Sequence, residues 1–226
     1  MSNSLWTPPA LAVQDGSSFP ARHVWCVGRN YAEHAREMGA DPAAAEPIFF
    51  AKPAAALIQA EQVAYPAATA ELHHEVELVV ALGQGGRNLD VHAALDCVAF
   101  YAVGVDLTRR DVQARAKAAG HPWEMSKAFD QSAPLGLLVP AERWSPSPDA
   151  LISLQVGDEQ RQSAHLRDMI WSVGELLTLL SARVTLQPGD LVFTGTPAGV
   201  GALQPGDRVR AEVEGLPRLE FKIARD

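Results

Sequence analysis

Two glutamates stand at the head of an apolar run. Glu75 and Glu77 occur in the segment His73-His74-Glu75-Val76-Glu77, and the run continues to Leu82. The pattern predicts a strand over 76–82, and side chains two residues apart on a strand point to the same face. Two like charges on a partly buried face repel each other unless a cation lies between them. The pair therefore either faces open water or holds a metal ion.

A third carboxylate, Asp106, follows a continuous apolar run over 98–105. That run predicts a strand buried on both faces, with Asp106 at its C-terminal end. Three carboxylates with water completing the shell suit Mg²⁺, Mn²⁺ or Ca²⁺ better than Zn²⁺, and the zinc pattern H-E-x-x-H is not matched. From the pattern alone, a solvated strand end with exposed His73 and His74 is as good an interpretation as a metal site.

A histidine and a glutamate form the second candidate group. His34 and Glu37 are three residues apart on a short helix predicted over 30–38, so they share a face. A carboxylate bonded to an imidazole fixes the tautomer and raises the basicity of the ring, which suits a general base acting on water. Taken alone, the pair is also typical of an ordinary helix surface.

Three further polar residues follow Asp106 along the chain. Arg110 and Gln113 share a face of a predicted helix, and Lys127 lies beside apolar and aromatic residues in Ser-Lys-Ala-Phe-Asp. Near a metal ion, such a lysine could stabilise an oxyanion or move a proton. A solvated helix face and a lysine that extends to water are the alternatives.

A glycine-rich segment over 194–201 contains Gly195 and Thr196. Such a loop can present backbone N–H groups to an anion. It lacks the Gly-Lys-Ser/Thr sequence and the following helix of a phosphate-binding loop, which argues against nucleotide binding. A substrate carboxylate would fit, and a tight turn between strands explains the same residues equally well.

The elements that must position these residues are mostly strands. Residues 1–22 predict a short arm or edge hairpin, and 23–226 predict one domain. Alternating or continuous apolar residues predict strands over 24–28, 48–51, 76–82, 98–105, 209–213 and 219–223. Helix-like patterns occur over 30–38, over 91–95, from Thr108 as N-cap to Ala119 with Gly120 as C-terminal cap, and over 166–181.

The composition is that of a soluble globular protein. Of the 226 residues, 47% are apolar and 20% are charged, and the net charge is -8. The acidic balance argues against nucleic acid and anionic membrane surfaces as partners. Cys26 and Cys97 lie in apolar runs and are expected to be buried, reduced thiols. Without a signal sequence or an apolar stretch that could span a bilayer, the expected location is the cytoplasm.

Together these motifs resemble the fumarylacetoacetate hydrolase family. The resemblance covers about residues 23–224, and several separated motifs agree in order, which makes it far more specific than any one of them. The matching stretches are 27–34 (Val-Gly-Arg-Asn-Tyr-Ala-Glu-His), 73–77, 105–113 (Val-Asp-Leu-Thr-Arg-Arg-Asp-Val-Gln), 126–129 (Ser-Lys-Ala-Phe) and 194–201 (Thr-Gly-Thr-Pro-Ala-Gly-Val-Gly).

The resemblance implies a fold and a metal site. The implied fold is β-rich α+β, with a mixed sheet rolled into a flattened barrel, and the implied assembly is a homodimer. Glu75, Glu77 and Asp106 would bind Mg²⁺ or Mn²⁺, with Ca²⁺ as a further option. The segment around 30–46 would be a lid that brings His34 and Glu37 to the site.

The resemblance also implies an activity. The substrate would be a 2,4-diketo acid, an acylpyruvate, cleaved to pyruvate and a carboxylic acid. The stretches 36–42 and 129–134 resemble the fumarylpyruvate-cleaving members that act in the breakdown of aromatic compounds. The implied roles are water activation by His34 with Glu37, oxyanion stabilisation by Lys127 and Gln113, and substrate binding by Arg29, Arg110, Gly195 and Thr196.

Two other functions fit part of the same pattern. A metal-dependent decarboxylase or isomerase of a related keto acid, such as oxaloacetate, would use the metal without an attacking water. A non-catalytic binding protein would keep the metal as a structural clamp. The His34–Glu37 pair argues against the clamp, because a clamp needs no base.

Overall fold

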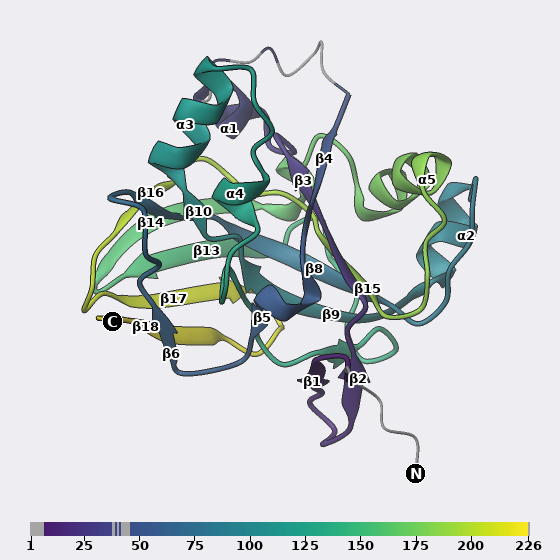
Figure 1. Cartoon of the computed structure of the whole chain (residues 1–226). Helices are drawn as coiled ribbons and strands as arrows, with labels where there is room; N and C mark the ends of the chain where they lie inside the picture. Colours follow the sequence, from purple (N-terminus) through teal and green to yellow (C-terminus); the bar gives the residue numbers. More distant parts are fainter. Residues whose placement is uncertain (1–6, 38, 40, 42–45, 226) are drawn as a thin grey trace.

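Two main sheets form the framework of the computed structural model, which describes residues 7–37, 39, 41 and 46–225 (Figure 1). The first is mixed and runs in the order β12 (Val139–Pro140), β9 (Val98–Val105), β8 (Val76–Leu82), β15 (Asp190–Phe193), β3 (His23–Gly28) and β4 (Ile48–Lys52). The second runs in the order β14 (Glu159–His165), β13 (Leu151–Val156), β17 (Arg208–Val213), β18 (Leu219–Ala224) and β6 (Gln62–Ala64).

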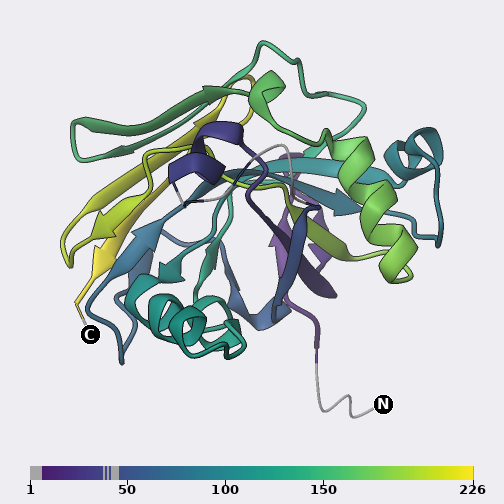
Figure 2. The ribbon, with the colours of Figure 1, turned by 90° about the horizontal axis from the view of Figure 1, so that it is seen from above.

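Short elements complete the fold around these sheets. The small sheets are β1 (Ala10–Ala12) with β2 (Ser18–Pro20), β10 (Thr108–Arg109) with β7 (Leu72–His74) and β16 (Gly201–Leu203), and β11 (Ala133–Pro134) with β5 (Leu57–Ile58). The helices are α1 (Ala32–Glu37), α2 (Val91–Asp96), α3 (Arg110–Ala118), α4 (Glu124–Lys127) and α5 (Val173–Arg183), with 3₁₀ turns at Ala54–Ala56 and Leu166–Asp168. Viewed from above, α3 and α5 lie at different sides of the sheets (Figure 2).

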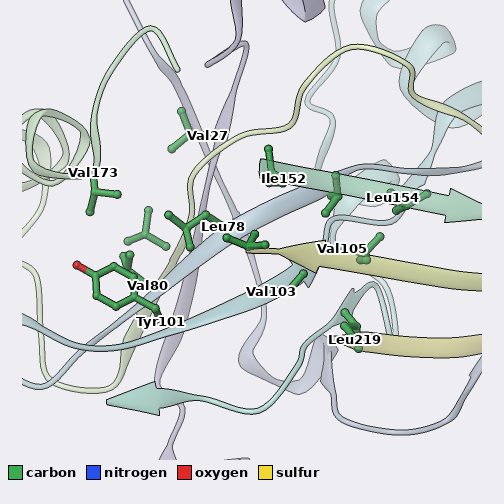
Figure 3. Close-up of a cluster of buried hydrophobic side chains, with 14 of the residues drawn as sticks. Val27, Leu78, Val80, Tyr101, Val103, Val105, Ile152, Leu154, Val173 and Leu219 are labelled. Atoms are coloured by element: carbon green, nitrogen blue, oxygen red, sulfur yellow. The ribbon is translucent and has the colours of Figure 1, made fainter. Parts of the chain in front are cut away.

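The main apolar core lies between the two sheets. Leu78 and Val80 of β8 belong to the same buried cluster as Ile152 and Leu154 of β13 (Figure 3). The other face of β8 is buried too, because Val79 packs into a second cluster. Burial on both faces explains why the run over 76–82 is apolar without alternation.

The strand predictions are confirmed, and the architecture is mixed and β-rich as expected. Each of the six predicted strands corresponds to an observed strand with bounds that differ by one residue at most. Among the described strands, however, hydrogen bonding closes neither main sheet on itself, so the flattened barrel is not confirmed.

The described part of the N-terminal segment packs against the domain. β1 and β2 form the expected hairpin, and Leu11 and Phe19 are buried in the second apolar cluster. The backbone of Gln14 also donates to the carbonyl of Leu138 at 2.9 Å. Residues 1–6 of the predicted arm lie outside the described residues.

The single helix predicted over 166–181 is wrong in its first half. Leu166–Asp168 is a 3₁₀ turn, and α5 begins only at Val173. Ser172 has extended backbone angles and forms a capping box with Glu175, which starts the helix there. The apolar spacing of the earlier residues reflects burial of individual side chains such as Leu166 and not a continuous helix.

The helix after Asp106 is confirmed, but its predicted N-cap is wrong. Thr108 lies in β10, where it pairs with His73 of β7, and α3 begins two residues later at Arg110. The Thr108 hydroxyl instead contacts the carbonyl oxygen of Asp106 at 3.3 Å. Gly120 does follow the helix in a left-handed conformation, as a C-terminal glycine commonly does.

Both cysteines match their prediction. Cys26 and Cys97 are buried and free. Within the described part of the chain, no helix combines the length and the apolar character needed to cross a bilayer.

We expect Ser172→Ala to destabilise the protein by about 1 kcal/mol, because it removes the hydroxyl from the α5 capping box. Chemical unfolding followed by circular dichroism would measure the change in the free energy of unfolding. Ser145→Ala, at an exposed loop position, is the control and should change it by less than about 0.5 kcal/mol. Equal changes in the free energy of unfolding for the two variants would contradict a stabilising role of the Ser172 cap.

Candidate active site

The pairing of β8 with β9 brings three carboxylates together. Val76 is opposite Val105, so Glu75 and Asp106 are neighbours, and the Asp106 N–H donates to the Glu75 carbonyl at 2.8 Å. Glu77 follows on β8. One oxygen from each of the three carboxylates lies within 4.8 Å of the other two, and all three residues are buried. The prediction that they form one group is therefore confirmed.

The three carboxylates differ in their surroundings. Burial, together with the negative charges of Asp106 and Glu75, raises the pKa of Glu77 well above its ordinary value. Burial acts in the same direction on Glu75, but Lys127 and Arg110 outweigh it and lower the pKa of that carboxyl. Three charges in such a confined place are costly unless cations surround them.

Two buried lysines supply part of that positive charge. Lys127 Nζ lies 2.8 Å from Glu75 Oε2 and 2.7 Å from Asp106 Oδ2. Lys52 Nζ lies 2.9 Å from Asp106 Oδ1 and donates to the carbonyl oxygens of Leu107 and Lys127. Lys52 is not among the residues predicted from the sequence, although a lysine at the end of the apolar run over 48–52 indicates a buried charge that needs a partner.

Arg110 and Gln113 of α3 lie beside Glu75. Arg110 is ion-paired with Glu75, and its NH1 donates to Gln113 Oε1 at 2.6 Å. Its Nε donates to His73 Nδ1 at 3.4 Å. Burial and Arg110 together lower the pKa of His73 to about 4, which agrees with a neutral ring that accepts this bond. Arg110 and Gln113 therefore line the same cavity as Glu75 and Glu77.

The histidine–glutamate pair forms as its spacing predicts. His34 Nδ1 lies 3.1 Å from Glu37 Oε2, and the His34 side chain is buried while that of Glu37 is 37% exposed. Because the carboxylate can only accept, Nδ1 carries the proton and Nε2 is left as an acceptor. The Gly199 N–H approaches the other Glu37 oxygen at 3.4 Å.

A buried asparagine fixes the start of α1. Asn30 Nδ2 donates to the carbonyls of Trp171 and Thr194, and Asn30 Oδ1 accepts from the Trp171 N–H at 2.8 Å. These three bonds tie the chain two residues before α1 to distant segments. Asn30 stood in the motif over 27–34, but its spacing alone could not reveal partners more than 140 residues away.

The glycine-rich segment contacts the same site. The Gly195 N–H donates to Glu77 Oε2 at 2.6 Å, and Thr196 Oγ1 accepts from Gln162 Nε2 at 2.8 Å. Gln162 of β14 is buried, and its Oε1 accepts from the Val76 N–H at 3.1 Å. Gln162 thus connects the two sheets beside the carboxylates, a role that its polar, strand-like neighbours did not indicate.

A cavity of about 40 Å³ opens over this group. Gly195 contacts Glu77, and Glu37 contacts His34. Asp106 does not line the cavity but is ion-paired with Lys127, which does. The other predicted site residues all line it: Arg29, His34, Glu75, Glu77, Arg110, Gln113, Lys127 and Thr196. Residues 38, 40 and 42–45 of the predicted lid lie outside the described residues.

The donor set fits a hard divalent cation. Three convergent carboxylate oxygens, all on buried residues, are the ligands that Mg²⁺ and Mn²⁺ prefer. Burial and the charges of Asp106 and Glu75 raise the pKa of Glu77, and a bound cation would relieve the repulsion among the three carboxylates. Glu75, Glu77 and Asp106 are therefore the residues that could hold the ion, with Lys127 beside them.

The family model of the fumarylacetoacetate (FAA) hydrolase C-terminal domain matches residues 23–224. Among solved structures, a fumarylpyruvate hydrolase from Pseudomonas aeruginosa, in complex with Mn²⁺ and pyruvate, is 45% identical, covers 100% of both chains and has a TM-score of 0.96.

Curated relatives with a similar percentage of sequence identity are named for a different activity, oxaloacetate tautomerisation. The mitochondrial oxaloacetate tautomerase FAHD1 of Rattus norvegicus is 42% identical over 206 residues, which are 90% of this chain and 92% of that protein. The oxaloacetate tautomerase YcgM of Escherichia coli (strain K12) is 43% identical over 199 residues, which are 87% of this chain and 90% of that protein.

We expect Glu77→Gln to have opposite effects on metal binding and on metal-free stability. Loss of a charged ligand should weaken Mn²⁺ binding by about 100-fold or more. Loss of a repelled buried charge should raise the melting temperature of the metal-free protein. Calorimetric titration with Mn²⁺ and thermal unfolding in chelator would measure the two effects.

Glu71→Gln is the matched control, because Glu71 is exposed and precedes the site in sequence. It should leave both quantities unchanged. Unaltered Mn²⁺ affinity in the Glu77 variant would exclude Glu77 as a ligand.

Proposed function

Since the protein belongs to the fumarylacetoacetate hydrolase family, we propose that it is a metal-dependent hydrolase that cleaves a carbon–carbon bond of an acylpyruvate such as fumarylpyruvate. The observation that carries the proposal is that His34, paired with Glu37, lines the same cavity as Glu75 and Glu77 of the carboxylate group. A divalent ion, Mg²⁺ or Mn²⁺, would act there as a Lewis acid toward the substrate oxygens and stabilise enolate charge.

Water activation falls to His34. Glu37 holds the proton on Nδ1, so Nε2 can take a proton from a water molecule in the cavity. The hydroxide equivalent attacks the C4 carbonyl of the 2,4-diketo acid. Glu37 also stabilises the imidazolium that forms, since its carboxylate lies 3.1 Å from Nδ1.

Lys127 and Gln113 would stabilise the oxyanion at C4. Two N–H groups of Lys127 are used by Glu75 and Asp106, which leaves the third to donate. Gln113 uses its carbonyl oxygen for Arg110, which leaves its amide N–H₂ as the donor. The C3–C4 bond then breaks, its electron pair goes to C3, and protonation of C3 gives pyruvate and a carboxylic acid.

The remaining cavity residues would orient the substrate. Thr196 accepts from Gln162, so its own O–H can donate to a substrate carboxylate. Arg110 and Arg29 add positive charge at the cavity wall, and Gly195 holds Glu77 in position. The -8 net charge of the chain makes this local positive charge important for an anionic substrate.

The oligomeric state, the location and the metabolic role of the protein are further parts of this proposal. We expect a homodimer in the cytoplasm that acts in the breakdown of aromatic compounds. The likeness to a fumarylpyruvate hydrolase over the full length of both chains supports the substrate on which this role depends. The homodimer is carried over from the family resemblance, and the location from the sequence.

Oxaloacetate tautomerase is the second candidate, and the names of the curated relatives favour it. Interconversion of keto and enol forms also needs a stabilised enolate. It needs no attacking water, so the His34–Glu37 pair would act only in proton transfer. A metal-dependent decarboxylation of the same keto acid would likewise proceed without water.

A substrate panel assayed with Mn²⁺ distinguishes these reactions. We expect pyruvate and fumarate from fumarylpyruvate at a kcat/KM at least tenfold above the value for oxaloacetate tautomerisation. Loss of diketone absorbance and product chromatography would follow hydrolysis. Faster turnover of oxaloacetate, with no cleavage of any acylpyruvate, would reject the hydrolase assignment.

We expect His34→Gln to lower acylpyruvate hydrolysis by about 10²–10⁴-fold, the usual contribution of a general base. Mn²⁺ affinity should be unchanged, since His34 is not among the carboxylate ligands. His92→Gln, at a side chain that is 90% exposed, should hydrolyse at the normal rate. Normal hydrolysis by the His34 variant would remove the water-activation role.

A further inference from the structure

We propose that Lys117 and Arg29 bind a second carboxylate at the far end of the substrate's acyl chain, so that the preferred substrates are acylpyruvates with a dicarboxylic skeleton. The inference rests on the proposed function, because it specifies the acyl group of that reaction. Lys117 had no role in the sequence analysis, and Arg29 had only a general one.

The cations that line the cavity fall into two pairs. Arg110 and Lys127 are ion-paired with Glu75. Arg29 and Lys117 line the same cavity, but among the described residues no carboxylate lies within ion-pair distance of either one. Arg110 and Lys127 thus compensate the charge of Glu75, whereas Arg29 and Lys117 are available to an anion that does not belong to this chain.

Lys117 is held at the wall of the cavity. It lies four residues after Gln113 on α3, so both are on one helix face, and both line the cavity. Its Nζ lies 5.1 Å from the centroid of the Trp123 ring, a cation–π contact. Lys117 is exposed on its outer side; partial burial and the charges of Arg110, Arg29 and Lys127, which line the same cavity, lower its pKa.

Arg29 has an uncommon backbone conformation. Its φ angle is 65°, in the left-handed region that few residues other than glycine adopt. Such conformations persist where the surroundings hold them and cluster at ligand-binding sites. Here Asn30, the next residue, is tied down by three hydrogen bonds. The result is an arginine in the cavity wall without an ion-pair partner there.

An apolar acyl chain is the competing occupant. A groove of about 220 Å³ adjoins the cavity. Its lining is mostly apolar and includes Ile48, Phe49, Phe50, Pro122 and Trp123. An apolar chain in this groove would bring no negative charge to Lys117 and Arg29, which lie beside two other cations, Arg110 and Lys127. A carboxylate at the end of the chain would neutralise them, so the charges favour the dicarboxylic substrate.

Lys117→Gln tests the assignment in the Mn²⁺-loaded protein. The ratio of kcat/KM for fumarylpyruvate to that for acetylpyruvate, which lacks the distal carboxylate, should fall at least tenfold. Arg115→Gln removes an equal charge from α3, at a side chain that is 67% exposed and paired with Asp111. This control should keep the ratio of the unmodified protein. A ratio that Lys117→Gln leaves unaltered would overturn the proposal.

Ligand binding gives a readout that does not depend on hydrolysis. Fumarate and crotonate have the same carbon chain, but crotonate has a methyl group in place of one carboxylate. Calorimetry should show at least tenfold tighter binding of fumarate, and Lys117→Gln should abolish this difference. If neither acylpyruvate is cleaved but fumarate is still preferred through Lys117, the hydrolase assignment fails and the carboxylate site stands. Equal binding of crotonate would overturn the site and favour the apolar groove.

Discussion

Three carboxylates share a small volume from which water is largely excluded, and the surrounding structure compensates for their repulsion. The antiparallel pairing of β8 with β9 places Glu75 beside Asp106, and Glu77 follows on the same strand. Charges at this depth need partners, and the chain supplies Lys52 and Lys127 within 2.9 Å. Every residue of β8 is buried, so packing on both faces of this strand holds the carboxylates in fixed positions.

The proposed base is anchored through backbone segments that are distant from it in sequence. His34 lies on a helix of six residues, too short to be stable in isolation. Its position depends on Asn30, which binds the backbone at Trp171 and Thr194. Thr194 in turn donates to the carbonyl of Leu78 on β8 at 2.9 Å. Hydrogen bonds thus connect α1 to β8, the strand that carries Glu77, although the two elements are distant in sequence.

The local sequence pattern was sufficient to predict the strands and the shared position of Glu75 and Glu77. Alternating side chains and continuous apolar runs are properties of neighbouring residues, so they can be read without knowledge of the fold. The start of α5 was misplaced because apolar spacing continued through a 3₁₀ turn, whereas Ser172 and Glu175 determine where the helix begins. Lys52 and Gln162 were missed for a different reason. Each is a single polar residue whose partners lie 34 to 88 positions away, and no local spacing encodes such contacts.

The two buried lysines have a consequence for the order of assembly. Because they already balance part of the negative charge, we expect the chain to fold before any ion binds, unlike small domains whose folding requires their metal. Occupancy would then follow the free concentrations of the divalent ions in the surroundings of the folded protein. Carboxylate sites of this kind discriminate weakly between Mg²⁺ and Mn²⁺, so the working ion is set by supply more than by the protein.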